Sequence, residues 1–397
     1  MIPNDMITFS LSELCEIKYG KDHKKLSDGK VPVYGTGGIM RYVDSYLYDK
    51  KSVLIPRKGT LSNIFFVNER FWTVDTLFWT KIKEDIISPK FLYYKLLTVD
   101  FSAMNVGSAV PSLTTELLNR IKLEIPTLLE QRAIANILSS FDEKIDMNNK
   151  INKNLEDLAQ TIYKRWFVDF EFPNEDGEPY KSSSGIMSES ELGLIPKEWQ
   201  IKTIGDYVTV KSGYAFKSSW WTDKGANVIK IKDLDNVMVD INKLDKVDNK
   251  HTIKANDFMV TRGDLLIAMT GATIGKIGLI TSSKRNIYVN QRVGKFFLGN
   301  SPVDKLPYLH SMMRDKRIID NIKSAGVGSA QPNISPTGIM SIKIPFKSEI
   351  IKEFNSNLKN IYLYYMNNIE ENKTLKSLRD ELLPKLMNGE IEVPIEG

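Results

Sequence analysis

Two short stretches of this sequence combine cations, hydroxyls and glycines in a way that suits contact with a polyanion. The first is Ile55-Pro56-Arg57-Lys58-Gly59-Thr60, and the second spans 263–276 and ends in Gly275-Lys276. Glycine lets backbone N–H groups approach a phosphate closely, and arginine can form a bidentate pair with guanine. Asparagine and glutamine can bracket adenine in the same way. The chemistry that these stretches could perform is therefore recognition of phosphates and base edges.

The candidate contact residues are polar, cationic and aromatic side chains in and around these stretches. They are Lys21, Tyr34, Arg57, Lys58, Thr60 and Ser108 in the first half, and Lys211, Tyr214, Lys217, Arg262, Thr270, Thr273, Lys276, Asn290, Gln291, Arg292, Gln331 and Asn333 in the second. An equally good interpretation of each cluster is a tight turn with exposed polar side chains. Aromatic residues such as Tyr19, Tyr34, Tyr214 and the pair Trp220-Trp221 belong to cores more often than to base-stacking sites.

No residue pattern predicts catalysis or a metal site. In 271–276 three rather than four residues separate the glycines of a phosphate-binding loop, and Ile277 stands where Ser or Thr would bind magnesium. The stretch 35–38 lacks the third glycine of a dinucleotide fingerprint. One cysteine, Cys15, and three scattered histidines do not make a zinc site. Asp142-Glu143-Lys144 is interpreted as a solvated helix face. We therefore expect a binding protein with no catalytic residue, no metal and no cofactor of its own.

The composition is that of a folded chain of two or three domains. Its 397 residues are 42% hydrophobic and 26% charged, which excludes disordered and low-complexity classes. Residues 199–347 carry 23 basic and 12 acidic residues, an excess that favours a polyanion-facing surface or simply a well-solvated domain surface. The sequence shows no signal peptide and no apolar segment of membrane-spanning length, so we expect a soluble, cytoplasmic protein.

The chain is a tandem repeat of a long unit. A block at 107–126 that contains Gly-Ser-Ala-Val-Pro returns at 328–345 as Gly-Ser-Ala-Gln-Pro. The two halves also open with the same spacing of residues, namely Leu11, Leu14, Ile17 and Gly20 against Ile204, Tyr207, Val210 and Gly213. The stretches between, 21–106 and 214–327, show little likeness. Each half is therefore a divergent module followed by a similar tail.

The tails predict two long helices. Apolar residues recur in a 4-3-4-3 pattern from Ile134 to Trp166 and again from Phe354 to Leu386, which is a heptad seam. Two asparagines stand in the middle of each seam, Asn148 and Asn152 in the first and Asn368 and Asn372 in the second. Each seam alone could belong to an ordinary amphipathic helix. Together they favour an antiparallel coiled coil of 130–167 against 349–388, with the four asparagines at its core.

The fold class predicted is α+β. We expect two α/β domains in a pseudo-two-fold tandem repeat, joined and spaced by the two long helices. The boundaries predicted are 1–127 for domain 1, 128–168 for the central spacer helix, 169–198 for a linker, 199–347 for domain 2 and 348–390 for the C-terminal spacer helix. Helices are also expected near 88–100 and 304–322.

This combination resembles the DNA specificity subunit of type I restriction–modification systems. The likeness is carried by the doubled architecture, by Ile125-Pro126 followed by Glu130-Gln131-Arg132-Ala133-Ile134, by Trp166-Phe167, and by Ile195-Pro196 followed by Trp199. It covers nearly the whole chain and is weak only within the divergent modules. The second tail departs from the pattern at 346–349 and has Pro384 near its end, which leaves the helix boundaries there open.

The resemblance implies that each domain is a target recognition domain, whose divergent module reads one half of a bipartite site in double-stranded DNA, and that the helices set the unread spacer. It also implies two methyltransferase subunits, which use S-adenosylmethionine to methylate adenine N6, and motor-nuclease subunits for restriction, with no membrane. Tyr163 and Phe167, expected to be exposed, are candidate contacts with these partners, although helix-end packing would explain them as well. A non-catalytic coiled-coil scaffold that joins two ligand-binding modules is the alternative.

Overall fold

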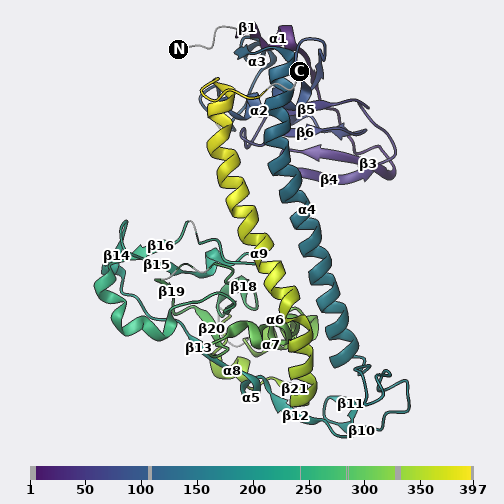
Figure 1. The fold of residues 1–397 in the computed structure, drawn as a ribbon, viewed down its shortest axis with the longest axis vertical. Helices are drawn as coiled ribbons and strands as arrows, with labels where there is room; N and C mark the ends of the chain where they lie inside the picture. Colours follow the sequence, from purple (N-terminus) through teal and green to yellow (C-terminus); the bar gives the residue numbers. More distant parts are fainter. Residues whose placement is uncertain are drawn as a thin grey trace. The chain divides into compact units, whose positions relative to one another are not determined.

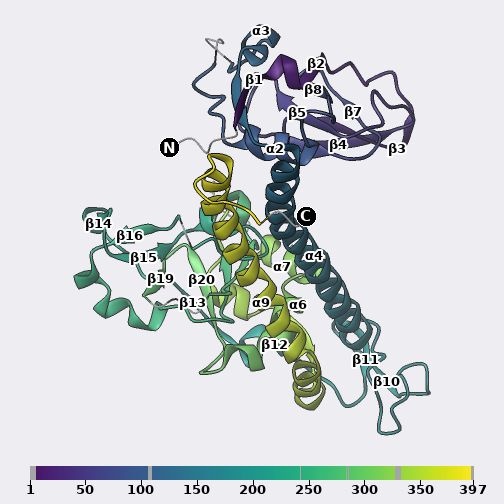
Figure 2. The same ribbon diagram turned by 45° about the horizontal axis from the view of Figure 1, so that its top comes forward.

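The computed structural model describes residues 6–105, 110–241, 243–282, 284, 286–326 and 332–394. The chain divides into two compact units, Met1–Asp146 with Lys373–Gly397 (unit 1) and Met147–Asn372 (unit 2). Figure 1 shows both units as ribbons coloured along the sequence, and Figure 2 shows them after a turn of 45°. Among the described residues, no helix combines the length and the apolar character needed to span a membrane.

Unit 1 is built on a four-stranded antiparallel sheet with the order β2-β8-β5-β6, beside a three-stranded sheet with the order β4-β3-β7 and a two-stranded ribbon β1-β9. The strands are β1 (Ile7–Ser10), β2 (Cys15–Tyr19), β3 (Asp28–Gly35), β4 (Gly38–Val43), β5 (Ser52–Pro56), β6 (Phe65–Val67), β7 (Trp72–Thr73), β8 (Leu77–Ile82) and β9 (Lys122–Ile125). The short helices are α1 (Leu11–Leu14), α2 (Pro89–Leu97) and α3 (Thr115–Asn119). Every residue of β5 is buried, as expected of a central strand covered on both faces.

Unit 2 repeats this plan with sheets of order β13-β20-β17-β18, β14-β16-β15-β19 and β12-β21, and adds the hairpin β10-β11. Its strands are β10 (Met187–Ser190), β11 (Gly193–Pro196), β12 (Gln200–Thr203), β13 (Thr209–Ser212), β14 (Trp221–Thr222), β15 (Ala226–Ile229), β16 (Asp245–Val247), β17 (Leu265–Ala268), β18 (Ile277–Leu279), β19 (Ile287–Val289), β20 (Val293–Phe297) and β21 (Lys343–Phe346). Its short helices are α5 (Ile204–Tyr207), α6 (Leu306–Met312), α7 (Lys316–Ala325) and α8 (Pro336–Met340).

The two divergent modules therefore share the order and pairing of their main strands. In unit 1 strand β3 pairs antiparallel with β4 and parallel with β7, and in unit 2 strand β15 pairs antiparallel with β16 and parallel with β19. The main sheets have the same order once β2, β8, β5 and β6 are matched to β13, β20, β17 and β18. Sheet topology depends on where residues are buried rather than on which residues they are, so sequences with little likeness can share it.

The shared opening of the halves has a local structural cause. Helices α1 and α5 each begin with a capping box, in which the backbone N–H of Ser10 or Thr203 donates to the carboxylate of Glu13 or Asp206. The conserved spacing then ends on a glycine in each half. A Cβ at Gly20 would lie 2.0 Å from the carbonyl oxygen of Val74, and one at Gly213 would lie 2.3 Å from that of Val289. Only glycine permits this close approach of two backbones.

The long helices are α4 (Leu128–Phe167) and α9 (Ser348–Met387), close to the predicted 128–168 and 348–390. They lie side by side and antiparallel: Asp142 pairs with Arg379 in unit 1, and in unit 2 Asn152 pairs with Asn368. The predicted antiparallel coiled coil is confirmed. Pro384 lies inside α9, which continues past it for three residues.

Three expectations need correction or refinement. Tyr163 and Phe167 are buried, because the ring of Phe167 lies 4.7 Å from that of Tyr308 on α6 and Tyr163 packs on Phe354, so they are not exposed partner contacts. The helix expected over 304–322 is split into α6 and α7, with Asp315 capping the second. The segment 169–198 is no free connector, since Phe170, Phe172 and Ile195 are buried in the core of unit 2.

Candidate nucleic-acid interface

Arg57 is held at the end of the buried strand β5 by contacts on both sides. Its backbone N–H donates to the carbonyl of Thr76 (2.8 Å), and its carbonyl accepts from the N–H of Leu113 (2.9 Å). The guanidinium donates to the carbonyl of Asp75 (3.1 Å) and lies 5.2 Å from the ring centroid of Tyr19. Among the described residues Arg57 forms no ion pair, so its full positive charge is presented at this position.

The backbone beside Arg57 forms a pair of loops, 57–60 with 111–113, which we call loop pair 1. Lys58 forms a β-bridge with Ser112, and the N–H of Gly59 donates to the carbonyl of Pro111 (2.9 Å). Gly59 has a φ of +89°, which favours glycine. Lys58 and Thr60 are exposed, and Ser108 lies outside the described residues. This loop pair holds three candidate contacts together.

The other two candidates of unit 1 are placed differently from each other. Lys21 is exposed, and its carbonyl accepts from the indole N–H of Trp72 (2.9 Å). Tyr34 packs on Phe65 and Phe71 in a small core, and burial raises the pKa of its hydroxyl. Tyr34 therefore follows the core interpretation, whereas Tyr19, expected in the core, is 50% exposed.

Unit 2 contains an equivalent loop pair, 269–273 with 332–334, which we call loop pair 2. Met269 donates to the carbonyl of Arg292 (3.2 Å) and accepts from the N–H of Ile334 (2.9 Å), as Arg57 does with Thr76 and Leu113. The N–H of Gly271 donates to the carbonyl of Pro332 (2.9 Å), and Thr270 forms a β-bridge with Asn333. Gly271 has a φ of +73°. These main-chain features of loop pair 1 are thus repeated in loop pair 2.

A turn before β20 brings further candidates to loop pair 2. Tyr214 forms a bridge with Asn290, and its carbonyl accepts from the N–H of Gln291 (3.0 Å). Gln291, Arg292 and Asn333 are exposed. Amide and guanidinium groups at one edge can pair with base edges. Gln331 lies outside the described residues.

The remaining lysines and the arginine of the prediction lie elsewhere in unit 2. Lys211 lies over the ring of Phe297 (5.0 Å) and Lys217 over Trp220 (5.5 Å), whose ring stacks on His251 at 4.2 Å. Arg262 donates to the amide oxygen of Asn367 on α9 (2.5 Å) and is not brought to loop pair 2. Thr273 and Lys276 line a pocket beside the loop pair.

The asparagines lie in a buried hydrogen-bonded cluster between the long helices of unit 2. Asn148 Nδ2 donates to Asn372 Oδ1 (2.9 Å), and Asn368 Nδ2 donates to Asn152 Oδ1 (2.9 Å). Asn152 Nδ2 in turn donates to the carbonyl of Tyr365 (3.2 Å). Buried amides paired in this way fix the register of two helices.

Sequence reasoning missed the residues that support these sites. Tyr19 lies under the Arg57 guanidinium, and Lys316 and Lys323 of α7 share a pocket with Lys276. The aromatic type of Tyr19 hid its exposure, because a tyrosine two residues after an apolar position in a strand is usually buried. The α7 lysines carried a usable signal, since they lie on the polar face of a strongly amphipathic helix.

The described residues contain no group of three or more His, Cys, Asp or Glu side chains that could hold a metal ion. The glycine-rich stretch 271–276 forms a 3₁₀ turn and then enters strand β18 instead of a helix, so it is not a nucleotide-binding loop of the kind considered above. The buried pair Asp264 and Lys295 (3.0 Å) lies within the main sheet, where burial raises the pKa of the aspartate and Lys295 also donates to the carbonyl of Met259.

The sequence of this chain matches a family model and several related proteins. The model of the type I restriction modification DNA specificity domain matches residues 3–157 and 196–347. The MjaVIII specificity subunit of Methanocaldococcus jannaschii is 23% identical over 353 residues, which cover 87% of this chain and 80% of that protein. The HindI specificity subunit of Haemophilus influenzae is 24% identical over 365 residues, covering 77% of this chain and 78% of that protein.

A solved structure shares the fold. The crystal structure of a type I restriction–modification S subunit from M. genitalium superposes with a TM-score of 0.64 at 16% identity, covering 99% of this chain and 98% of that one.

Proposed function

Because the chain belongs to the family defined by the type I restriction modification DNA specificity domain, we propose that it is the non-catalytic subunit that selects the DNA sequence for a type I restriction–modification complex. Each module would read one half of a bipartite site in double-stranded DNA. The module in unit 1 would use loop pair 1 with Lys21, and the module in unit 2 would use loop pair 2 with the turn at Asn290–Arg292.

The observation that carries this proposal is the equivalence of the two loop pairs. The same main-chain hydrogen bonds fix both, while the side chains that they present differ. A framework that is repeated but carries different polar groups is what two readers of different sequences need, since base identity is read by side chains and not by the scaffold.

The long helices provide the second part of the proposal. Each of α4 and α9 is 40 residues long, or about 60 Å at 1.5 Å per residue. The asparagine cluster fixes their register. We assign to these helices the role of setting the number of unread base pairs between the two half-sites.

Catalysis would belong to the partners. We propose that two methyltransferase subunits, which bind S-adenosylmethionine, modify adenine N6 in each half-site, and that motor-nuclease subunits join the complex for restriction. The specificity chain would position the DNA, and extrusion of the target adenine from the duplex would occur in the methyltransferase. We propose a cytoplasmic location for the chain, where such a complex would meet its DNA.

Modification-sensitive sequencing of genomic DNA tests the proposal directly. Cells with the gene intact are compared with cells in which it is deleted, with the methyltransferase gene present in both. We expect a two-part motif that carries methyladenine in each half and disappears on deletion. The control is a deletion strain supplied with another specificity gene, which proves that the methyltransferase is active. Unchanged methylation in the deletion strain would refute the proposal and favour the scaffold alternative.

A further inference from the structure

A basic pocket lies beside loop pair 2 within unit 2. Its volume is about 470 Å³, and its walls come from Asn236, from the turn 272–276 and from the segment 313–323 that includes most of α7. Four of the lining residues are cations, namely Lys276, Arg314, Lys316 and Lys323, and none of the lining residues is acidic or aromatic. The chemistry of the walls therefore suits an anion and offers no ring on which a base could stack.

Two of the four cations are already compensated. Arg314 lies 2.6 Å from a carboxylate oxygen of Glu156, and Lys316 lies 2.9 Å from one of Asp320. Lys276 and Lys323 form no ion pair with any residue that the structure describes. The pocket thus retains two positive charges that a bound anion would neutralise.

The turn that carries Lys276 packs closely on α7. Gly275 has a φ of +85°, and a Cβ there would lie 3.4 Å from the side chain of Ile319 and 3.9 Å from Cε of Lys323. The stem of Lys323 therefore lies along the turn next to Lys276. This packing places the exposed Lys323 and the half-buried Lys276 beside the same turn.

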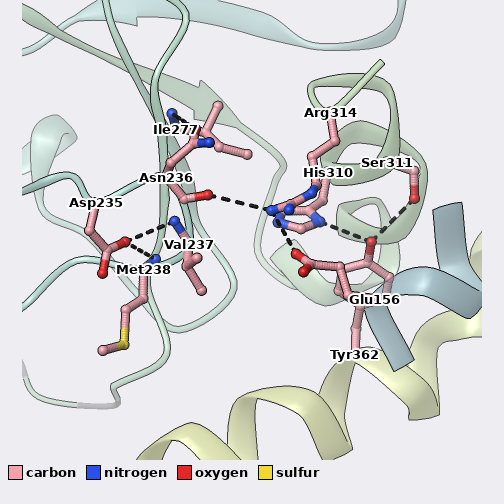
Figure 3. A network of polar contacts seen from close by, with 10 residues as sticks. All are labelled: Glu156, Asp235, Asn236, Val237, Met238, Ile277, His310, Ser311, Arg314 and Tyr362. Atoms are coloured by element: carbon pink, nitrogen blue, oxygen red, sulfur yellow. Dashed lines mark hydrogen bonds and ion pairs between the residues drawn. The ribbon is translucent and has the colours of Figure 1, made fainter. Parts of the chain in front are cut away.

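The rim of the pocket is fastened to helix α4 (Figure 3). Arg314 Nη1, besides its ion pair with Glu156 of α4, donates to the carbonyl of Asn236 (3.4 Å). The side chain of Asn236 accepts from the N–H of Ile277, which follows Lys276 (3.3 Å), and the side chain of Asp235 accepts from the N–H groups of Val237 and Met238. The pocket is thus a built part of unit 2.

Both walls of the pocket continue into loop pair 2. The turn 272–276 follows Thr270 and Gly271 directly, and α7 ends at Ala325, next to Gly326, whose carbonyl accepts from the N–H of Asn333 (3.2 Å). Asn333 in turn forms the bridge with Thr270. A duplex whose bases reached loop pair 2 would therefore bring its sugar-phosphate chain close to this pocket.

We propose that the pocket binds backbone phosphates of the DNA whose second half-site is read at loop pair 2, with Lys276 and Lys323 as the phosphate ligands. This inference rests on the proposed function and assigns a different role to the two lysines from that of Arg292 and Asn333. Lysine is a strongly hydrated point charge that attracts phosphate without selecting a base, so the pocket positions the duplex and does not specify the sequence.

The test measures binding of the full-length chain, assembled with its methyltransferase subunits, to a duplex with the motif found by sequencing and to an unrelated duplex. We expect K276Q/K323Q to weaken both by the same factor, about tenfold, and to lower the slope of log affinity against log salt by about 2. The matched control is K197Q/K352Q, which removes the same charge from two exposed lysines on other elements of unit 2 and should leave the slope nearly unchanged.

Neutral methylphosphonates placed one at a time along the specific duplex locate the contact. The wild-type complex should lose affinity at one or two phosphates beside the second half-site, and the double variant should be insensitive at those same phosphates. A double variant that remains sensitive there, or that loses only specific binding, would overturn the proposal.

Two further outcomes distinguish this proposal from binding of a free phosphate and from failure of the proposed function. If millimolar inorganic phosphate raises the melting temperature of the wild type but not of the double variant, while DNA affinity is equal for both, the pocket serves a free phosphate ligand and the DNA assignment is wrong. If the wild-type complex shows no preference for any motif, the proposed function itself fails, whatever the lysine variants do.

Discussion

Arg57 and Met269 occupy the same backbone position in the two modules. The N–H of Arg57 donates to the carbonyl of Thr76, just before β8, and the N–H of Met269 donates to the carbonyl of Arg292, just before β20. The carbonyl of Arg57 accepts from the N–H of Leu113, and that of Met269 accepts from the N–H of Ile334. Met269 is buried, whereas the Arg57 guanidinium reaches over Tyr19. In unit 2 the arginine stands instead at position 292, which is equivalent to Thr76. The framework is thus constant, and the cation has a different place in each module.

The Arg57→Ala variant should affect only one half of the recognition site. An arginine that reads a base contributes about 1–3 kcal/mol of discrimination, so methylation should weaken or relax at one or two base pairs of half-site 1 while half-site 2 is unchanged. Sequencing the methylome of cells that carry the variant measures this. Arg70→Ala is the matched control, because Arg70 also lies over a tyrosine (5.0 Å from the Tyr46 ring) but is not part of loop pair 1. Equal loss in both half-sites would contradict the modular interpretation.

The Arg292→Ala variant should have the reciprocal effect. The substitution removes the exposed guanidinium from the turn beside loop pair 2, so base preference in half-site 2 should relax by a similar amount while half-site 1 keeps its sequence. The same methylome measurement serves, with the Arg57→Ala strain as the comparison. If both variants relaxed the same half-site, the assignment of one module to one half-site would be wrong.

The asparagine cluster should fix the register of the two helices at a cost in stability relative to an apolar core. Asn368→Ala leaves Oδ1 of the buried Asn152 without its donor and should lower the free energy of unfolding by about 1–3 kcal/mol. Replacing both residues by leucine should restore or raise stability while it loosens the register of the helices. The midpoint of urea unfolding, followed by circular dichroism, measures both effects. Asn154→Ala, at an exposed position of α4 close to Asn152, is the control. A fully stable Asn368→Ala variant would show that the cluster contributes nothing.

The length of the helices should determine the spacer of the site. Duplicating residues 146–152 and 368–374 keeps the heptad phase and lengthens each helix by about 10.5 Å, the rise of about three base pairs. The methylated motif should then contain a longer spacer with unchanged half-sites, and deleting seven residues from each helix should shorten it. A duplicated chain that still methylates only the original spacing would refute the ruler role.

The stability of the chain should fall in mild acid because of His310. This side chain is buried against Tyr362, and desolvation, helped by the nearby Arg314, lowers its pKa to about 3 from an ordinary 6.5. Below pH 6.5 the unfolded state binds a proton that the folded state cannot, so stability decreases as the pH falls towards 3. Between pH 7 and pH 5 the loss should be about 2 kcal/mol. His310→Gln should show a flatter pH dependence of unfolding. Parallel curves for the two proteins would mean that His310 is not neutral in the fold.

The sequence was most informative where structure depends on a repeating period. A heptad pattern sustained along a helix specifies which face packs on a partner helix, so α4, α9 and the clustering of the four asparagines between them could be predicted. The shared strand pairings of the two modules could not be predicted, because they join residues far apart in the chain. The strand β5, for example, is buried at every residue and shows no alternation.

For the candidate contacts, the sequence indicated which stretches form turns but not which tertiary contacts each side chain makes. The stretches 57–60 and 269–273 could be predicted to be turns because they contain glycine and polar side chains, but their pairing with 111–113 and 332–334 could not. Arg262 also stands beside a glycine in a polar turn, as several other candidate contacts do. Its guanidinium nevertheless donates to Asn367 of α9, a contact that only the tertiary structure could show. Tyr163 and Phe167 fall partly outside the ideal heptad seam, but α6 covers them, so an argument from the helix alone predicted their exposure wrongly.

The make-up of unit 1 has a consequence for how the protein is made. Its core includes Leu386 and Met387 from the end of α9, and the buried ammonium of Lys95 donates to the carbonyl of Met387 (2.7 Å). Unit 2, by contrast, is one continuous segment, Met147–Asn372. On the ribosome, at about 5–20 residues per second, roughly 10–50 s separate the synthesis of the first part of unit 1 from that of its last helix. The part of the protein that is translated first therefore completes its core last, and it waits with an uncovered apolar surface until the final helix emerges.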